Sequence, residues 1–185
     1  MNSLKGQLLL DSGKLAGSEF HHTVVLICQH DPEGAFGLVL NRMSEQTVDA
    51  ALSEKMPVTV QDLPLYFGGP VQPKMLSCLI YDPANIEIDQ MPILPGLRLM
   101  HDLDELLKPS ESAAAFKQIK FFAGYAGWSP GQLDNEIQMA AWLTHPASID
   151  LVFHPEPENL WRLILRGKGP KYRLLAEAPD DLANN

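Results

Sequence analysis

The sequence predicts an α+β fold, a single domain built on a mixed or antiparallel β-sheet with several short helices beside it. The chain has 185 residues, which is close to the usual size of one domain. Strand-like runs dominate early, and helical patterns enter irregularly, without the regular alternation of a βαβ protein. Fifteen prolines and 13 glycines are scattered along the chain and divide it into many short elements.

The clearest local unit is an early β-hairpin. One apolar run over 22–28 and a second over 35–40 flank a short turn. Asp31, Pro32 and Gly34 suit a type I turn, because proline fixes φ and the aspartate can bond the backbone that follows it. Neither run alternates with polar residues, so we expect both faces of the hairpin to be covered.

Further strands are expected where β-branched and aromatic residues cluster between turn signals. The strongest of these patterns cover 65–67, 75–81 and 118–123. Weaker patterns cover 86–88 and 149–153.

Two short helices are expected in the first 110 residues. One begins at Ser44 and places its apolar residues on one side. The other begins at Asp102, which forms a capping box with Glu105, and it ends before Pro109.

Two later helices have stronger start signals. Ser129 is a typical N-cap, Pro130 suits the first helical position, and Gln132 can reach back to the cap. The apolar face of this helix is expected to contain Leu133, Ile137, Ala140 and Ala141. The last helix spans about 156–166 and closes at Gly167. Its inward-facing residues are expected to be Leu160, Leu163 and Ile164.

Composition and charge exclude several classes of protein. An apolar share of 45%, a charged share of 20% and a mean hydropathy of −0.08 are ordinary for a globular chain and exclude a disordered, fibrous or membrane-spanning one. The net charge of −9 repels a polyanion, and no helix-turn-helix signature is present, so direct nucleic-acid binding is not expected. The basic stretch 162–173 either meets an anionic partner or is an ordinary solvated helix face.

The sequence also predicts the domain organisation and the cellular location of the protein. We assign residues 1–166 to one domain and 167–185 to a C-terminal extension that is basic at its start. Cys28 and Cys78 lie in apolar runs, where a free thiol behaves as a small buried hydrophobe. The absence of a CxxC motif or disulfide framework fits a reducing compartment. There is neither a signal-peptide core nor an apolar stretch of about 18 residues, so we expect a soluble cytoplasmic protein.

Several strings of the sequence carry a resemblance to one family. They are KGQLLLDSG followed by EFHHTVVLICQHDPEGAFGLVLNR, then YFGGPV, then GYAGWSPGQLDNEIQMAAWL. In this order, and over most of the chain, they resemble the AlgH/YqgE family of bacterial proteins. The resemblance implies an α+β fold with a branched, strongly coiled sheet and a regulatory role, since one member is linked by name to the control of alginate synthesis. It implies no reaction, cofactor or catalytic residue.

The chain also departs from the family's pattern. Members commonly have arginine where this chain has His22, and glutamate where it has Asp134. A role that needs a cation or a longer carboxylate at these positions is therefore not carried over.

Two glycine-rich stretches are candidate binding elements. Residues 124–132 lead into a helix start whose free N–H groups can hold an anion while Tyr125 or Trp128 stacks on a ring. Their spacing matches neither the P-loop nor the dinucleotide fingerprint, and the structural alternative is close backbone approach with the aromatic rings in the core. Gly68 and Gly69 can line the same cleft if the two stretches meet.

The polar candidates lie on and beside the hairpin. The hairpin separates His30 at one end from Asn41 and Arg42 at the other. His30 can be a base or a metal ligand, or can bond the turn, and Arg42 can form an ion pair or a helix-cap contact. The pair His21 and His22 suggests a metal site, but adjacent residues on a strand point to opposite faces. We therefore predict no metal or other cofactor.

The sequence contains no recognisable catalytic constellation. The leading hypothesis is a non-enzymatic regulatory or interaction protein that binds a protein partner or a small ligand. Self-association is also compatible with the chain, since strand edges and exposed aromatic residues favour such contacts. The alternative is a small-molecule sensor or an enzyme that uses the glycine-rich cleft. The candidate surface comprises His30, Asn41, Arg42, Gly68, Gly69, Tyr125, Trp128, Gln132 and Glu136.

Overall fold

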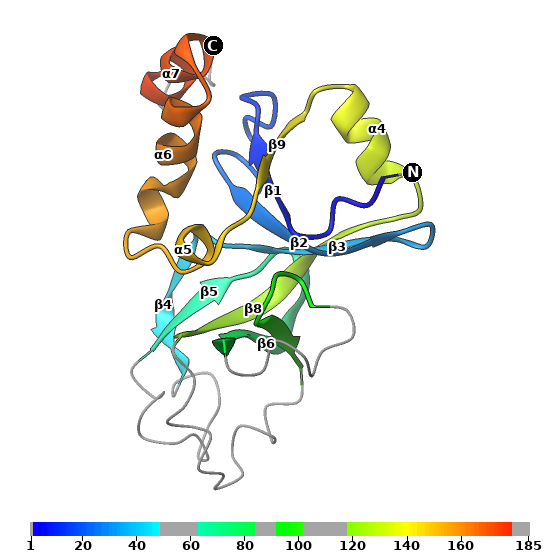
Figure 1. The fold of residues 1–185 in the computed structure, drawn as a ribbon, viewed down its shortest axis with the longest axis vertical. Helices are drawn as coiled ribbons and strands as arrows, with labels where there is room; N and C mark the ends of the chain where they lie inside the picture. The colour runs from blue at the N-terminus through cyan, green and yellow to red at the C-terminus, as the bar shows by residue number, and fades with distance from the viewer. Residues whose placement is uncertain (1, 49–62, 84–91, 102–117, 179–185) are drawn as a thin grey trace, which may run out of the picture.

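The computed structural model describes residues 2–48, 63–83, 92–101 and 118–178. These residues form a nine-stranded mixed sheet with short helices beside it, which confirms the α+β class (Figure 1). The strands are β1 (Gln7–Asp11), β2 (Val24–Asp31), β3 (Gly34–Val39), β4 (Met43–Thr47), β5 (Pro64–Phe67), β6 (Val71–Tyr81), β7 (Leu97–Met100), β8 (Gln118–Trp128) and β9 (Trp142–Pro146). The helices are α4 (Gln132–Gln138), α5 (Ile149–Val152), the 3-10 turn η3 (Pro157–Asn159), α6 (Leu160–Gly167) and α7 (Pro170–Glu177).

The sheet branches at β8. The first half of β8 is parallel to β5 on one side and antiparallel to β6 on the other. Its last residues pair instead with β3, and the sheet continues from there through β2 and β1 to the edge strand β9. The expected branching of the sheet is therefore present, and it falls inside one of the glycine-rich stretches.

The predicted hairpin is confirmed. Strands β2 and β3 are antiparallel, and Asp31 is opposite Gly34 across the turn. The Asp31 Oδ1 atom accepts a hydrogen bond from the Glu33 backbone N–H at 2.8 Å, which is the expected contact between an aspartate and the turn that follows it.

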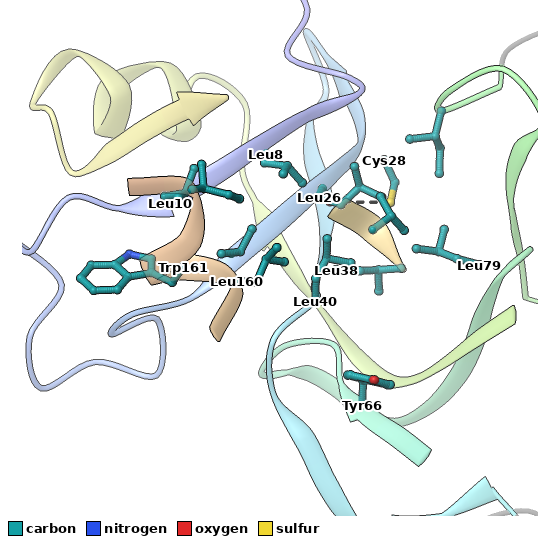
Figure 2. Packing of buried hydrophobic residues seen from close by; sticks show 14 of the residues in the cluster. Leu8, Leu10, Leu26, Cys28, Leu38, Leu40, Tyr66, Leu79, Leu160 and Trp161 are labelled. Atoms are coloured by element: carbon teal, nitrogen blue, oxygen red, sulfur yellow. Dashed lines mark hydrogen bonds between the residues drawn. The ribbon is translucent and has the colours of Figure 1, made fainter. Parts of the chain in front are cut away.

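Both faces of the hairpin and of β1 are covered, as the unbroken apolar runs predict. Alternate residues point to opposite faces and enter two separate core clusters. The cluster shared with α6 includes Leu8, Leu10, Leu26, Leu38 and Trp161 (Figure 2). The cluster beside α4 includes Leu9, Val25, Val39, Trp128 and Leu133. The hairpin is therefore held rigidly from two sides.

One element has the wrong type in the prediction, and another begins at the wrong residue. The run 149–153 forms helix α5 instead of a strand, because Ser148 acts as its N-cap and accepts a hydrogen bond from Leu151 N–H. Ser44 lies in strand β4, which pairs with β5, so the predicted start of this helix is wrong. Val48 is helical, and the expected helix beyond it lies outside the described residues.

The helix after the glycine-rich stretch is shorter than predicted. Helix α4 begins at Gln132, after a left-handed Gly131. Gln132 still reaches back, and its Oε1 accepts a hydrogen bond from Ser129 N–H at 3.1 Å. Ala140 has a φ of 52° and, with Ala141, lies beyond the helix end. Their expected place on the helical face is wrong.

The C-terminal helices form a pair. Of the expected inward-facing residues of α6, Leu160 and Ile164 are buried, whereas Leu163 is 45% exposed, so its predicted burial is wrong. Helix α7 packs on α6, and its Ala176 belongs to the core cluster that contains Trp161. The expected division at 166 remains a prediction.

Some strands were not predicted, and some predicted elements lie outside the described residues. Strands β1, β7 and β9 are not predicted from the sequence, and β8 continues five residues beyond the predicted 118–123. The expected strand 86–88 and the helix beginning at Asp102 lie outside the described residues. Among the described helices, none has the length and apolarity that crossing a bilayer requires.

Candidate functional site

The two glycine-rich stretches meet, and they meet backbone to backbone. Gly68 N–H donates to Ala123 O at 2.8 Å, and Gly68 O accepts from Val39 N–H at 2.9 Å. A Cβ atom added to Gly69 would lie 2.2 Å from the Tyr125 carbonyl carbon, which leaves no room for a side chain. These glycines therefore allow β8 to branch. Neither of them is among the described residues that line the adjacent cavity, although Val71 of the same loop is.

An open cavity of about 540 Å³ lies between the second glycine-rich stretch and the hairpin turn. We call it the hairpin hollow. Its described lining residues are Gln29, Asp31, Glu33, Gly34, Ala35, Phe36, Val71, Tyr125, Gly127, Trp128, Ser129 and Pro130. The hollow thus joins the first hairpin to the end of β8, two segments that are about 90 residues apart in the sequence.

The described lining of the hairpin hollow contains three aromatic rings and two carboxylates. Phe36 and Tyr125 are partly exposed, and their ring centroids lie 4.8 Å apart. Asp31 and Glu33 are at the turn, and the hydrogen bond from the Gln29 side chain, more than that from the Glu33 backbone, lowers the pKa of Asp31. Asp31 is therefore ionised at neutral pH, and no lysine or arginine is among the described residues that line the hollow.

Trp128, Gln132 and Glu136, which the sequence marked as candidates, form an internal network. The Glu136 Oε2 atom accepts hydrogen bonds from Trp128 Nε1 at 2.9 Å and from Trp142 Nε1 at 2.7 Å. Its Oε1 atom accepts from Gln132 Nε2 at 2.9 Å. This carboxylate fastens α4 to the ends of β8 and β9, and both of its oxygens are in use.

His30 is buried and anchors the N-terminal segment. Its Nδ1 accepts a hydrogen bond from Leu4 N–H at 3.0 Å, which leaves the proton on Nε2, 3.6 Å from Asp134 Oδ2. The expected hydrogen bond to the turn is wrong, because the ring faces Leu4. His30 is not among the described residues that line the hairpin hollow.

Asn41 and Arg42 lie at the other end of the hairpin, as predicted, and bond the backbone. Asn41 Oδ1 accepts from Val24 N–H at 2.8 Å, and its Nδ2 donates to His22 O at 2.9 Å. Arg42 Nη2 donates to His21 O at 3.1 Å. These contacts hold the loop that precedes β2, and they do not bring either residue to the hollow.

Among the residues that the structure describes, one group could hold a metal ion. It consists of Asp11, His21 and His22, whose ligand atoms lie within 4.8 Å of one another. The expectation that the two histidines point to opposite faces is wrong, because they precede β2 and their rings stack with centroids 3.8 Å apart. His22 also stacks on Trp161 at 3.9 Å. Nearly parallel rings direct their in-plane lone pairs along separate planes, so they do not converge on one ion.

Asp11 is itself committed to the backbone. Its Oδ1 accepts from Gly13 N–H and Leu15 N–H, and its Oδ2 accepts from His22 N–H at 3.0 Å. The carboxylate therefore closes the loop between β1 and β2. The group is therefore a stack of rings on a loop that a carboxylate closes, and we propose no metal site there.

Lys120, which is buried in β8, is among the polar residues that the sequence reasoning missed. Its Nζ donates to Leu40 O at 3.0 Å and Val152 O at 3.2 Å, and it lies 4.0 Å from the centroid of the Tyr66 ring. Burial lowers the pKa of Lys120 to about 7. The signal in the sequence is a lone lysine inside the apolar run IKFFA.

Comparison with known proteins gives the family. A family model described as AlgH-like matches residues 8–173. The chain belongs to the AlgH-like family. This AlgH-like chain is 39% identical over 183 residues to a UPF0301 protein of Chlorobium luteolum, covering 95% of this chain and 91% of that protein. It is 33% identical over 181 residues to a UPF0301 protein of Chlamydia pneumoniae, covering 98% and 95%.

Two solved structures have the same fold. A protein from Corynebacterium diphtheriae matches with a TM-score of 0.78 at 23% identity, over 96% of this chain and 93% of that one. The AlgH protein from Pseudomonas aeruginosa matches with a TM-score of 0.73 at 29% identity, over 96% and 95%. The resemblance noted in the sequence is confirmed at the level of family and fold.

Proposed function

We propose that this AlgH-like protein is a non-enzymatic regulatory or interaction protein that acts by binding a ligand in the hairpin hollow. One observation carries the proposal. The polar candidates His30, Asn41, Arg42 and Glu136 are occupied by internal hydrogen bonds, whereas the hollow presents partly exposed rings and two carboxylates. Such a surface is suited to recognition.

An enzyme that uses the same hollow is less well supported. No histidine, lysine or cysteine is among its described lining residues, so Ser129 has no neighbouring imidazole to activate it. A small-molecule sensor is the second candidate, because about 540 Å³ falls within the usual range of ligand cavities. Cys28 and Cys78 are both free and buried, which supports a cytoplasmic location for either role.

A variant with a large side chain inside the hairpin hollow tests the proposal. Ser129 is exposed and lines the hollow, so Ser129→Trp should occupy the space without altering the core. The control is Gln138→Trp on the exposed side of α4, outside the described lining. We expect a thermal-shift screen of metabolites and short peptides to yield compounds that raise the melting temperature of the wild type and of Gln138→Trp but not of Ser129→Trp.

Two results would contradict the proposal. Compounds that stabilise Ser129→Trp as strongly as the wild type bind somewhere else. Turnover of a compound by the purified protein, abolished by Ser129→Ala, would make the protein an enzyme.

A further inference from the structure

The hairpin hollow has a charge character that limits its ligands. Asp31 and Glu33 are carboxylates at its rim, and its described lining contains no cationic side chain. Asp31 keeps its charge because Gln29 Nε2 donates to its Oδ2 at 2.6 Å and Glu33 N–H donates to its Oδ1 at 2.8 Å. These bonds also fix the direction of the carboxylate, so that it is preorganised for a charged partner.

The aromatic part of the hollow complements the same charge. Phe36 and Tyr125 are partly exposed, and their rings are tilted by 39° to one another. The face of an aromatic ring attracts a cation within about 6 Å of its centroid. Rings beside a carboxylate are the usual surroundings of a bound ammonium or guanidinium group.

A second, smaller cavity lies beside the first. It has a volume of about 260 Å³ and shares Gln29 and Phe36 with the hairpin hollow. Lys5 and His101 line it, in place of the carboxylates of the first cavity. Two adjoining cavities on either side of Phe36 suit an extended ligand better than a compact one.

We propose that the hairpin hollow receives the basic side chain of an extended peptide segment from a partner protein, with arginine as the best fit. This inference rests on the proposed function and specifies its ligand. The apolar stem of the arginine lies against Phe36 and Tyr125, and its guanidinium group reaches Asp31 and Glu33. The peptide backbone then crosses Phe36 toward the smaller cavity.

Two matched peptides test the charge requirement. The first is a blocked pentapeptide with one arginine flanked by glycines, and the second has citrulline, the neutral isostere, at the same place. Binding is followed by NMR through the indole N–H of Trp128 in protein labelled at its tryptophans, with the signal assigned from Trp128→Phe. We expect the citrulline peptide to bind about tenfold more weakly, as for the loss of one ion pair with its ring contact.

Variants of the hollow localise the effect. Asp31→Asn with Glu33→Gln keeps the shape of the turn, because asparagine can still accept the bond from residue 33. We expect this double variant to lose most of the preference for arginine over citrulline. Glu45→Gln, on the exposed strand β4 outside the described lining, is the control for lost charge and should keep the preference.

Each remaining outcome overturns a defined part of the proposal. If the two peptides bind equally well, and the double variant does not change this, the ligand need not be a cation. The proposed function is then tested separately by the screen with Ser129→Trp. If free butylguanidinium binds as tightly as the arginine peptide, the ligand is a small organic cation. The proposal that a peptide segment of a partner protein binds here is then wrong. No shift of the Trp128 signal with any of the three probes at millimolar concentration removes the inference altogether.

Discussion

At the scale of single residues, the polar side chains of this protein mainly bond its own backbone. Asp11, His30 and Asn41 each accept a hydrogen bond from a backbone N–H of a neighbouring segment. Lys120 donates to two backbone carbonyls from within the core. A buried donor or acceptor without a partner is costly, so these residues fix loops that would otherwise leave the backbone unpaired.

Lys120 gives a prediction about pH. Its pKa is lowered from 10.5 to about 7 by burial, so between these values the unfolded chain binds the proton and the folded chain does not. The contribution of Lys120 to the free energy of unfolding should therefore rise as the pH increases from about 7 to 10.5, by up to about 1.4 kcal/mol per pH unit. Lys120→Met should remove this rise.

The measurement is urea unfolding of both proteins at several pH values. Lys74→Met, at an exposed position on β6, is the control and should follow the wild type. If the curves of Lys120→Met and wild type run parallel from pH 7 to 10, Lys120 keeps an ordinary pKa and the account of its burial is wrong.

Glu136 gives a second prediction at this scale. Glu136→Gln keeps the shape of the side chain but replaces one of its two acceptor oxygens by a donor, so one of three N–H groups loses its partner. We expect a loss of about 1–3 kcal/mol in the free energy of unfolding, measured by urea titration. The exposed Glu45→Gln should cost less than about 0.5 kcal/mol. Equal effects of the two changes would show that the tryptophan contacts do not stabilise the protein.

At the scale of elements, the glycine-rich stretches explain how one strand serves two parts of the sheet. At Gly124, where φ is 69°, β8 leaves β5 and turns toward β3. Gly68 fits against this turn, because a Cβ atom there would lie 2.2 Å from Gly124 O. The sequence motif therefore marks the branch of the sheet.

Gly68→Ala should accordingly be severely destabilising. The new methyl group meets backbone, which cannot move aside as a flexible side chain would, so we expect a loss of more than about 2 kcal/mol. Gly167→Ala is the matched control, since its Cβ would meet nothing within 4 Å and alanine favours a helix by up to about 1 kcal/mol. The prediction is refuted if thermal melting shows Gly68→Ala to be as stable as Gly167→Ala.

The sequence predicts local elements better than it predicts their partners. The hairpin could be predicted because Asp31, Pro32 and Gly34 determine the turn by themselves. The expected strand at 149–153 is wrong because the cap provided by Ser148 outweighs a short apolar run. Strand β9 escaped prediction because it depends on pairing with β1, which lies about 130 residues earlier in the chain.

The sequence predicts only part of the candidate site, because it shows local patterns but not which segments lie side by side. Tyr125 and Trp128 do line the hairpin hollow, and aromatic residues next to glycines were the signal for them. Asp31, Glu33 and Phe36 belong to the hairpin, and no local pattern shows that the hairpin lies beside the end of β8. Only the register of β3 with β8 brings the two segments together.

At the scale of the whole molecule, charge is divided between two regions. Helices α6 and α7 carry four basic residues and one acidic residue, and in Figure 1 they lie on the opposite side from α4 and the tip of the hairpin. The hairpin hollow is acidic. An acidic ligand should therefore prefer the helices and a basic ligand the hollow.

Mapping the bound arginine peptide by amide chemical shifts in fully 15N-labelled protein tests the central claim most directly. The account predicts that shifts concentrate at residues 29–36 and 125–130 and disappear in Ser129→Trp. Shifts concentrated at residues 160–177 instead, and unchanged by Ser129→Trp, would contradict it.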